Sequence, residues 1–461
     1  MSTKKETQQI INQAKFLFDQ GMIDSAFKSL DKAITLYEDN EDILDFAALI
    51  AYQSHKSDFQ ERYLLKLISI NPSNFIYHIN LISLYIIRLK RFDDALNSLE
   101  ALSQIEFNDF ISLKRAGTSA SILAKPILAS KFYKKASLIN PHDIELKYYL
   151  AINYLAQGKL KEGWKLLDNR IGSDVQKSIK GIHSLIGQNI PFWMGEDLKD
   201  KSIIIISEQG FGDFIMFFRF VIELKNLYPS SQIKIVCRKP LIKLLENLPL
   251  DIDIYDETDK NSLRNISADF YSFIMSIPKH LEISVGHLKN KIPFIAKNNN
   301  SKTIAKYRNQ KKMSVGLSWK GDPNFQNDES RSIHDLSILS PLLEVKNCNF
   351  VGLHLDGNQY IKGYEIDQVG TEILNFQDTA EIISNLDLVI SVDSANVHLA
   401  GSMDIPCWVL MPKLNLDWRW YLEEECSYWY NSVRIFKQKE YDDWRYPIKC
   451  VKSELEKLLS Q

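Results

Sequence analysis

The chain has 461 residues, of which 45% are hydrophobic and 25% are charged, and its formal net charge is −2. This length and ordinary globular composition predict about two to four compact units and exclude a largely disordered chain. Lysines and arginines are interspersed with acidic residues, whereas a nucleic-acid-binding protein usually carries a basic excess or a basic stripe, so nucleic acid is not an expected partner.

The N-terminal segment and the cysteines indicate a compartment. The opening MSTKKETQQIINQ lacks the apolar core of a signal peptide, and no apolar run approaches the roughly 18 residues of a membrane span. The five cysteines are far apart and include no CxxC pair, which disfavours a disulfide framework or a structural zinc site. We therefore expect a cytoplasmic protein with no membrane span and no bound metal.

Residues 1–172 contain a repeated helical pattern. Small residues recur at equivalent positions, each followed about one turn later by a larger apolar residue; the small residues are Ala26, Ala95, Ala129 and Gly163. The period of about 34 residues resembles the tetratricopeptide repeat, and it predicts about five helix pairs stacked into a curved solenoid. Such solenoids usually bind extended peptide. A generic helical bundle is the alternative.

The rest of the chain predicts an α/β region in two halves. Residues 173–198 mix glycine, serine and proline without a steady period, which is typical of a connector. Buried strands then alternate with amphipathic helices in residues 199–300, and the pattern restarts in residues 301–461. This alternation predicts two Rossmann-like halves with parallel sheets and a cleft between them, and ligands bind such sheets at the carboxyl ends of the strands.

The first candidate motif is SEQGFGD, residues 207–213, at the end of a predicted strand. Gly210 and Gly212 allow a tight turn and close approach of the backbone to a ligand, and Gln209 lies in the same cleft loop. Asp213 falls in the first turn of the following helix, where its carboxylate can face the cleft. The alternative is that Asp213 only caps the helix, and the spacing leaves both interpretations open.

The second motif is SVDSANVHLAG, which also follows a predicted strand and opens a helix. Ser391, Asp393 and Ser394 precede the helix, and Asn396 and His398 lie in its first turn. Free backbone N–H groups and the helix dipole suit a diphosphate, and the serine hydroxyls can add donors. The alternative is an N-cap cluster with a packed histidine.

A long polar loop, SWKGDPNFQNDESRSI, follows a strand of the same half. Lys320 and Arg331 are candidate phosphate contacts, the arginine through a bidentate fork, and Asn327 can shape the loop. A solvated charged loop is the alternative. No HExxH, GxSxG or Walker motif occurs, which disfavours metalloproteases, serine hydrolases and P-loop ATPases.

Several long motifs of residues 191–444 together resemble the heptosyltransferase-like (family 9) glycosyltransferase domain found in bacterial repeat-containing proteins. They are PFWMGE, SEQGFGDFIMFFRF, VGLSWKGDPNFQNDESRSI, LDLVISVDSANVHLAG, DWRWYLEEECSYWYNSVRIF and YDDWRY. The resemblance implies a GT-B fold, an inverting mechanism without an obligatory metal, Asp213 as general base, and a donor held against residues 391–401. Ser394 stands where threonine is commoner, and residues 413–416 differ from the usual proline-bearing segment, so the donor sugar stays open.

The resemblance and the residue types favour a glycosyltransferase that takes a nucleotide-sugar as substrate and needs no cofactor. A carboxylate must accept the proton of the acceptor hydroxyl, and positive groups with helix N–H donors must stabilise the leaving phosphate. The leading hypothesis is transfer to a Ser or Thr of a protein that the repeats select. Bacterial enzymes of similar layout glycosylate flagellin, which makes flagellin a candidate acceptor. The alternatives are a glycan or lipid-linked acceptor, and a non-catalytic adaptor with a degenerate transferase domain.

Overall fold

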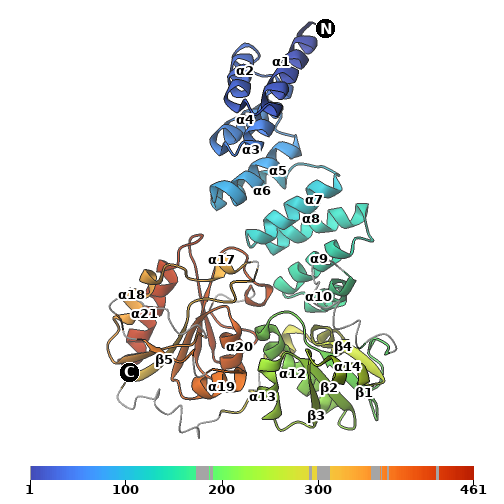
Figure 1. Cartoon of the computed structure of the whole chain (residues 1–461), viewed down its shortest axis with the longest axis vertical. Coiled ribbons are helices and arrows are strands. Elements are labelled where there is room, and N and C mark those ends of the chain that lie inside the picture. The colour runs from blue at the N-terminus through green and yellow to red at the C-terminus, as the bar shows by residue number, and fades with distance from the viewer. Residues whose placement is uncertain are drawn as a thin grey trace. The chain divides into compact units, whose positions relative to one another are not determined.

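The computed structural model divides the chain into two compact units, Met1–His142 and Asp143–Gln461. It describes residues 2–172, 186, 190–289, 293–297, 312–325, 327–354, 364, 366–370, 373–421 and 425–460. Most of the predicted connector, residues 173–198, and the predicted boundary between the α/β halves after residue 300 lie outside the described residues. Figure 1 shows the elements along the chain.

The first unit is built from helix pairs. Its helices are α1 (Ser2–Asp19), α2 (Ile23–Leu36), α3 (Glu41–Gln53), α4 (Ser57–Ile70), α5 (Phe75–Leu84), α6 (Phe92–Leu102), α7 (Phe110–Ile122) and α8 (Pro126–Ile139), with a π-helical turn η1 (Tyr85–Leu89) after α5. Consecutive helices pack as α1 with α2, α3 with α4, α5 with α6, and α7 with α8. The repeat pattern predicts this arrangement, and the helical character of the region is confirmed.

The capping chemistry follows the same repeat. Asn40, Asn74, Asp109 and Asp143 open α3, α5, α7 and the next odd-numbered helix, α9 (Ile144–Ala156), and each accepts a hydrogen bond from a backbone N–H of the first turn. Successive caps are 34, 35 and 34 positions apart. Asparagine and aspartate suit this position because their short side chains satisfy N–H groups that the helix itself leaves unpaired.

The last helix pair belongs to the second unit although it continues the repeat. It consists of α9 and α10 (Leu160–Leu167) and is followed by a 3-10 turn, η2 (Asp168–Gly172). Trp164 of α10 is 2% exposed, and its indole N–H donates to the carbonyl of Ile283 at 3.0 Å. Its ring meets Phe217 and Trp418 edge-on. These contacts explain why the compact units divide after His142, before the end of the predicted repeat region at residue 172.

The first sheet of the second unit has four parallel strands in the order β3-β2-β1-β4. They are β1 (Ser202–Ile206), β2 (Gln232–Cys237), β3 (Ile252–Asp256) and β4 (Phe270–Phe273). Its helices are α12 (Phe211–Leu227), α13 (Lys239–Glu246), α14 (Lys260–Asn265), η4 (Ile274–Ser276), α15 (Ile277–His280) and α16 (Val285–Lys289). The four isoleucines of β1 are buried, as expected for a parallel strand covered on both faces.

The second sheet has six parallel strands in the order β10-β9-β8-β5-β6-β7. They are β5 (Met313–Ser318), β6 (Cys348–Gly352), β7 (Asp367–Gln368), β8 (Leu388–Val392), β9 (Cys407–Met411) and β10 (Val433–Lys437). Its helices are α17 (Asp328–Arg331), η6 (Leu336–Leu339), α18 (Ser340–Leu343), α19 (Phe376–Ser384), α20 (Ala395–Ser402), η8 (Trp418–Trp420) and α21 (Arg445–Leu459). Two parallel α/β sheets are therefore confirmed.

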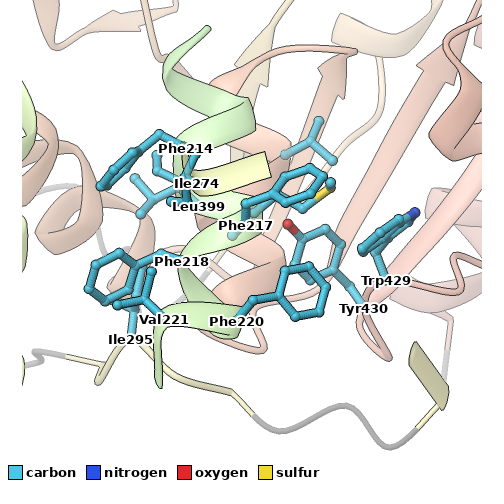
Figure 2. Packing of buried hydrophobic residues seen from close by; sticks show 14 of the residues in the cluster. Phe214, Phe217, Phe218, Phe220, Val221, Ile274, Ile295, Leu399, Trp429 and Tyr430 are labelled. Carbon is cyan, nitrogen blue, oxygen red and sulfur yellow. The ribbon is translucent and has the colours of Figure 1, made fainter. Parts of the chain in front are cut away.

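A shared apolar core joins the two sheets of this unit, and α12 lies within it. Figure 2 shows the phenylalanines of α12 packed beside Leu399 of α20 and beside Trp429 and Tyr430. Phe217 and Trp429 have ring centroids 6.2 Å apart. The helix is apolar on nearly all sides, which is typical of a helix buried between layers. This packing fixes the start of α12, where the first candidate motif lies.

Candidate functional site

The loop before α12 holds Asp213 by a helix cap. Gly210 is the N-cap residue and has no side chain to offer, so the carboxylate of Asp213 reaches back and accepts the Gly210 N–H at 2.7 Å. Gln209 has left-handed backbone (φ 59°), and its carbonyl accepts from Arg238 at 2.6 Å. The capping role considered for Asp213 is thus present, and it occupies one of the two carboxylate oxygens.

The other oxygen of Asp213 pairs with Arg419, a residue that sequence reasoning missed. Arg419 lies in η8 and also contacts both oxygens of Asp417 at 2.8 Å. The Arg419 side chain is 5% exposed, whereas that of Asp213 keeps 20% exposure. Burial raises the pKa of Asp213, and the positive charge of Arg419 opposes that rise. The carboxylate is therefore fixed in place, charge-paired, and partly open to solvent.

Asp393 adds a third carboxyl group to this cluster. It follows β8 directly, and its pKa is raised to about 7 by burial and by the charge of Asp417, against the opposing charges of Arg331 and Arg419. The carboxylate of Asp213 contributes to the same rise. Three acidic side chains and two arginines from both α/β halves therefore act on one another within the same site.

Close helix packing brings the first two candidate motifs together. A Cβ added to Gly212 would lie 2.7 Å from Cδ2 of His398 and 3.2 Å from Cα of Ala395, so the first turns of α12 and α20 touch. Both turns follow the carboxyl ends of strands, where open α/β sheets bind ligands. Gly212 and Ala395 are 183 positions apart in the sequence, and the fold joins them.

The first turn of α20 has the features of an anion site. Its N-cap residue, Ser394, accepts no hydrogen bond from the helix through its side chain. The hydroxyls of Ser391 and Ser394 are 3.0 Å apart, and Ser391 also donates to the Val392 carbonyl. Asn396 donates to the hydroxyl of Ser318 at the end of β5. The turn thus sits between β5 and β8, where the strand order of the second sheet reverses.

His398 is a packed side chain in this structure. It is buried, its Nδ1 lies 3.0 Å from the hydroxyl of Tyr430, and its ring stacks against Trp420. Its Nε2 lies 3.9 Å from Asp393. Burial lowers the pKa of His398 well below its usual value, and the charge of Arg419 lowers it further, so the imidazole is neutral near pH 7. This geometry matches the alternative that the sequence left open.

The polar loop after β5 supplies Arg331 to the cluster. The guanidinium of Arg331 lies over the ring of Phe325 and pairs with Asp328 at 3.1 Å, while its charge also acts on Asp393. Asn327 is exposed and precedes α17, where its carbonyl accepts from the Ser330 hydroxyl. Lys320 is half-buried just after β5. The donor roles of Lys320 and Asn327 stay predictions. Among the described residues, no group of three or more His, Cys, Asp or Glu is arranged to hold a metal.

Comparison with known proteins gives one curated relative and several structural neighbours. No protein-family model matches the chain. The chain is similar to Protein FlbA of Caulobacter vibrioides, with 23% identity over 336 residues that cover 66% of this chain. That alignment covers 54% of FlbA, so the chain spans about half the length of the curated relative.

The structural neighbours align with a minor part of the chain. YrrB, a TPR protein with an unusual peptide-binding site, is 16% identical over 37% of this chain and 87% of its own, with a TM-score of 0.32. MamA is 14% identical over 37% and 93%, also with a TM-score of 0.32. PilF of Pseudomonas aeruginosa is 15% identical over 40% and 82%, with a TM-score of 0.29. Within the part of the chain that the structure describes, no helix has the length and apolar character needed to cross a bilayer.

Proposed function

We propose that the chain is an inverting, metal-independent glycosyltransferase of the GT-B type. It moves a sugar from a nucleotide-sugar donor to a Ser or Thr hydroxyl of a protein selected by the helix pairs. The observation that carries this proposal is the contact of Gly212, the residue before Asp213, with the first turn of α20, whose N-cap residue Ser394 makes no side-chain cap hydrogen bond. The Asp213 carboxylate of one α/β half acts on Asp393 of the other, next to the proposed anion site.

The chemistry of transfer fits these groups. The acceptor oxygen attacks the anomeric carbon and forms the new C–O bond, while its proton passes to Asp213. The bond from the anomeric carbon to the donor phosphate breaks, and its electron pair leaves with the phosphate. The first turn of α20 and the guanidinium of Arg331 then stabilise the leaving charge. General-base help of this kind is worth roughly 10²–10⁴-fold in rate.

The pairing of Asp213 with Arg419 is compatible with the proposed transferase and also with the main alternative, a non-catalytic adaptor. As a base, Asp213 must be ionised, and Arg419 favours that state against the effect of burial. As part of a non-catalytic adaptor, the same pair would be a permanent structural bridge between α12 and η8. Donor binding and turnover distinguish the two.

The first experiment is a thermal-shift screen of the full chain against nucleotide diphosphates, CMP and their sugars. A donor at 100 times its dissociation constant stabilises the fold by about 2.7 kcal/mol, which gives a clear shift. Stabilisation by one nucleotide class names the donor and opens the acceptor search, with flagellin as one candidate. No stabilisation by any nucleotide favours the adaptor.

The second experiment compares Asp213→Asn with Asp259→Asn. Both residues cap helices of the same α/β half, but Asp259 caps α14 by accepting from Asn261 and Ser262. The amide oxygen of the Asp213 variant still accepts the Gly210 N–H, so the helix start is retained. We expect transfer to fall roughly 10²–10⁴-fold with donor binding intact, and the Asp259 variant to match wild type. Undiminished turnover by Asp213→Asn contradicts the base assignment.

A further inference from the structure

The ligand crevice of the first sheet is filled by a side chain of η2, the turn that follows the last helix pair. Strand order reverses between β1 and β4, and the loops after two such strands form the usual ligand crevice of an α/β sheet. Glu208 follows β1, and its Oε1 accepts the N–H of Met275, which follows β4, at 3.0 Å. Arg170 of η2 reaches this point with its side chain 0% exposed. Its Nε and Nη2 donate to the two oxygens of Glu208 at 2.7 and 2.6 Å.

The buried charge of Arg170 is fully compensated by neighbours. Its Nη2 also donates to the Ser276 hydroxyl at 3.0 Å, and its Nη1 donates to Asp168 at 3.2 Å. Asp168 in turn accepts from Ser276 at 2.6 Å and from Lys279 at 3.0 Å. Burial alone would lower the pKa of Arg170, but Glu208 and Asp168 outweigh it and raise that pKa. A buried pair of this kind adds little stability compared with apolar residues of the same size. The main contribution of the pair is that its two parallel hydrogen bonds fix the position of Glu208.

The loop that Arg170 holds is the loop that holds Asp213. Glu208 is fixed by Arg170, Gln209 is fixed through its carbonyl by Arg238, and Gly210 binds the carboxylate of Asp213. These anchors act on three consecutive residues, so a shift of Glu208 is passed on to the helix cap.

The same helix pair also contacts the other side of the cluster. Trp164 of α10 packs edge-on against Phe217, one turn beyond Asp213 in α12, with ring centroids 6.1 Å apart. It packs against Trp418, the neighbour of Arg419, at 5.6 Å. The last helix pair thus supports both members of the pair formed by Asp213 and Arg419.

We propose that Arg170 is a positioning residue that acts through Glu208 to set the place and ionisation of Asp213. This inference rests on the proposed function of the Asp213 site. It makes the last helix pair a component of the transfer site in addition to its place at the end of the repeats.

The test uses the full chain with Arg170→Met and Glu208→Leu combined, which replaces the buried pair by apolar side chains of similar size. The control is the same pair of substitutions, Arg434→Met with Glu454→Leu, at an ion pair between β10 and α21 that is 3.1 Å long and partly exposed. We expect the double variant at Arg170 to stay folded, with a lower melting temperature because the Met275 N–H loses its acceptor. Its KM for the donor should stay within about twofold of wild type. Its kcat should fall roughly 10–100-fold, because small misplacement of a reacting group is costly. The control pair should leave kcat unchanged.

The pH profile separates positioning from stability. A shift of Glu208 that is passed on to Gly210 weakens the hydrogen bond from the Gly210 N–H to Asp213. Weaker hydrogen bonding to the ionised carboxylate raises its pKa, so the acid limb of kcat should move to higher pH in the Arg170 double variant. A folded variant with wild-type kcat and pH profile overturns the inference. If the double variant does not fold, Arg170→Lys keeps the charge and loses the bidentate fork, and the same readouts apply.

The positioning role of Arg170 can be tested even if the proposed transfer activity is not found. If wild type shows no turnover with any donor, amide hydrogen exchange of residues 207–213 still tests the positioning. Faster exchange in the Arg170 double variant than in the Arg434 control supports it, and equal exchange overturns it.

Discussion

A methyl group added at Gly212 would press on both helix starts of the candidate site. Its Cβ would lie 2.7 Å from Cδ2 of His398, closer than real Cβ contacts, and 3.2 Å from the backbone of Ala395. His398 cannot swing away, because its ring is stacked on Trp420 and bonded to Tyr430 at 3.0 Å. In Gly212→Ala, α12 and α20 must therefore separate by some tenths of an ångström.

The size of the effect follows from two opposing terms. Overpacking of this kind costs about 1–3 kcal/mol, and replacing a helical glycine by alanine returns about 0.5–1 kcal/mol. We expect Gly212→Ala to lose roughly 1–2 kcal/mol of unfolding free energy, a fall of about 2–6 °C in melting temperature. Donor affinity should fall as well, because the first turn of α20 is the proposed phosphate site.

Urea unfolding of the full chain, together with the nucleotide thermal-shift panel, measures both effects. Gly286→Ala in α16 is the matched control, since the nearest atom to its Cβ is the Ser284 hydroxyl at 3.6 Å, an ordinary contact. This control should be neutral or slightly more stable. If Gly212→Ala is as stable as the control and binds donor normally, the first turns of α12 and α20 are not in the close contact described above.

Two further changes test the electrostatics and the last helix pair. The raised pKa of Asp393 means that its folded form holds a proton up to about pH 7, while the unfolded form releases it near 4. Between pH 5.5 and 8 the unfolding free energy of wild type should therefore fall by on the order of 2 kcal/mol relative to that of Asp393→Asn. If urea unfolding gives the same difference between the two proteins at both pH values, this prediction is refuted. Trp164→Ala should cost about 3–5 kcal/mol in urea unfolding through lost packing on Phe217 and Trp418, whereas Trp164→Phe loses chiefly the bond to the Ile283 carbonyl. Equal stability of the two Trp164 variants would contradict the packing role.

Local patterns in the sequence predict the elements well. The helix repeat follows from small residues such as Ala129, which is fully buried, and from a period that the caps at Asn74 and Asp109 reproduce. The strands at β1 and β8 follow from short apolar runs that only a sheet covered on both faces can bury. These signals lie within a few residues of one another, and tertiary packing agrees with them.

The candidate site is harder to predict because its partners are far apart in the chain. Asp213 and its loop stand out from spacing alone, but Arg419 lies 206 residues away in a 3-10 turn with no periodic pattern. In the sequence, the local indication of this ion-pair cluster is the motif DWRW, which holds an acidic residue, Asp417, and a basic residue, Arg419. Arg170 gave no signal either, since an arginine at the end of a helix is usually solvated, and only the fold buries it against Glu208.

The division of the chain after His142 separates helix pairs that differ in how freely they can be exchanged during evolution. The cap at Asp143 opens the helix pair that carries Trp164 and leads into Arg170 of η2. Both side chains are packed into the α/β unit, so this pair cannot be exchanged freely. The earlier helix pairs lie in the other compact unit, and their caps follow a repeat of 34 or 35 residues. Sequence changes upstream of Asp143 leave Trp164, Arg170 and the residues of the candidate site themselves unaltered.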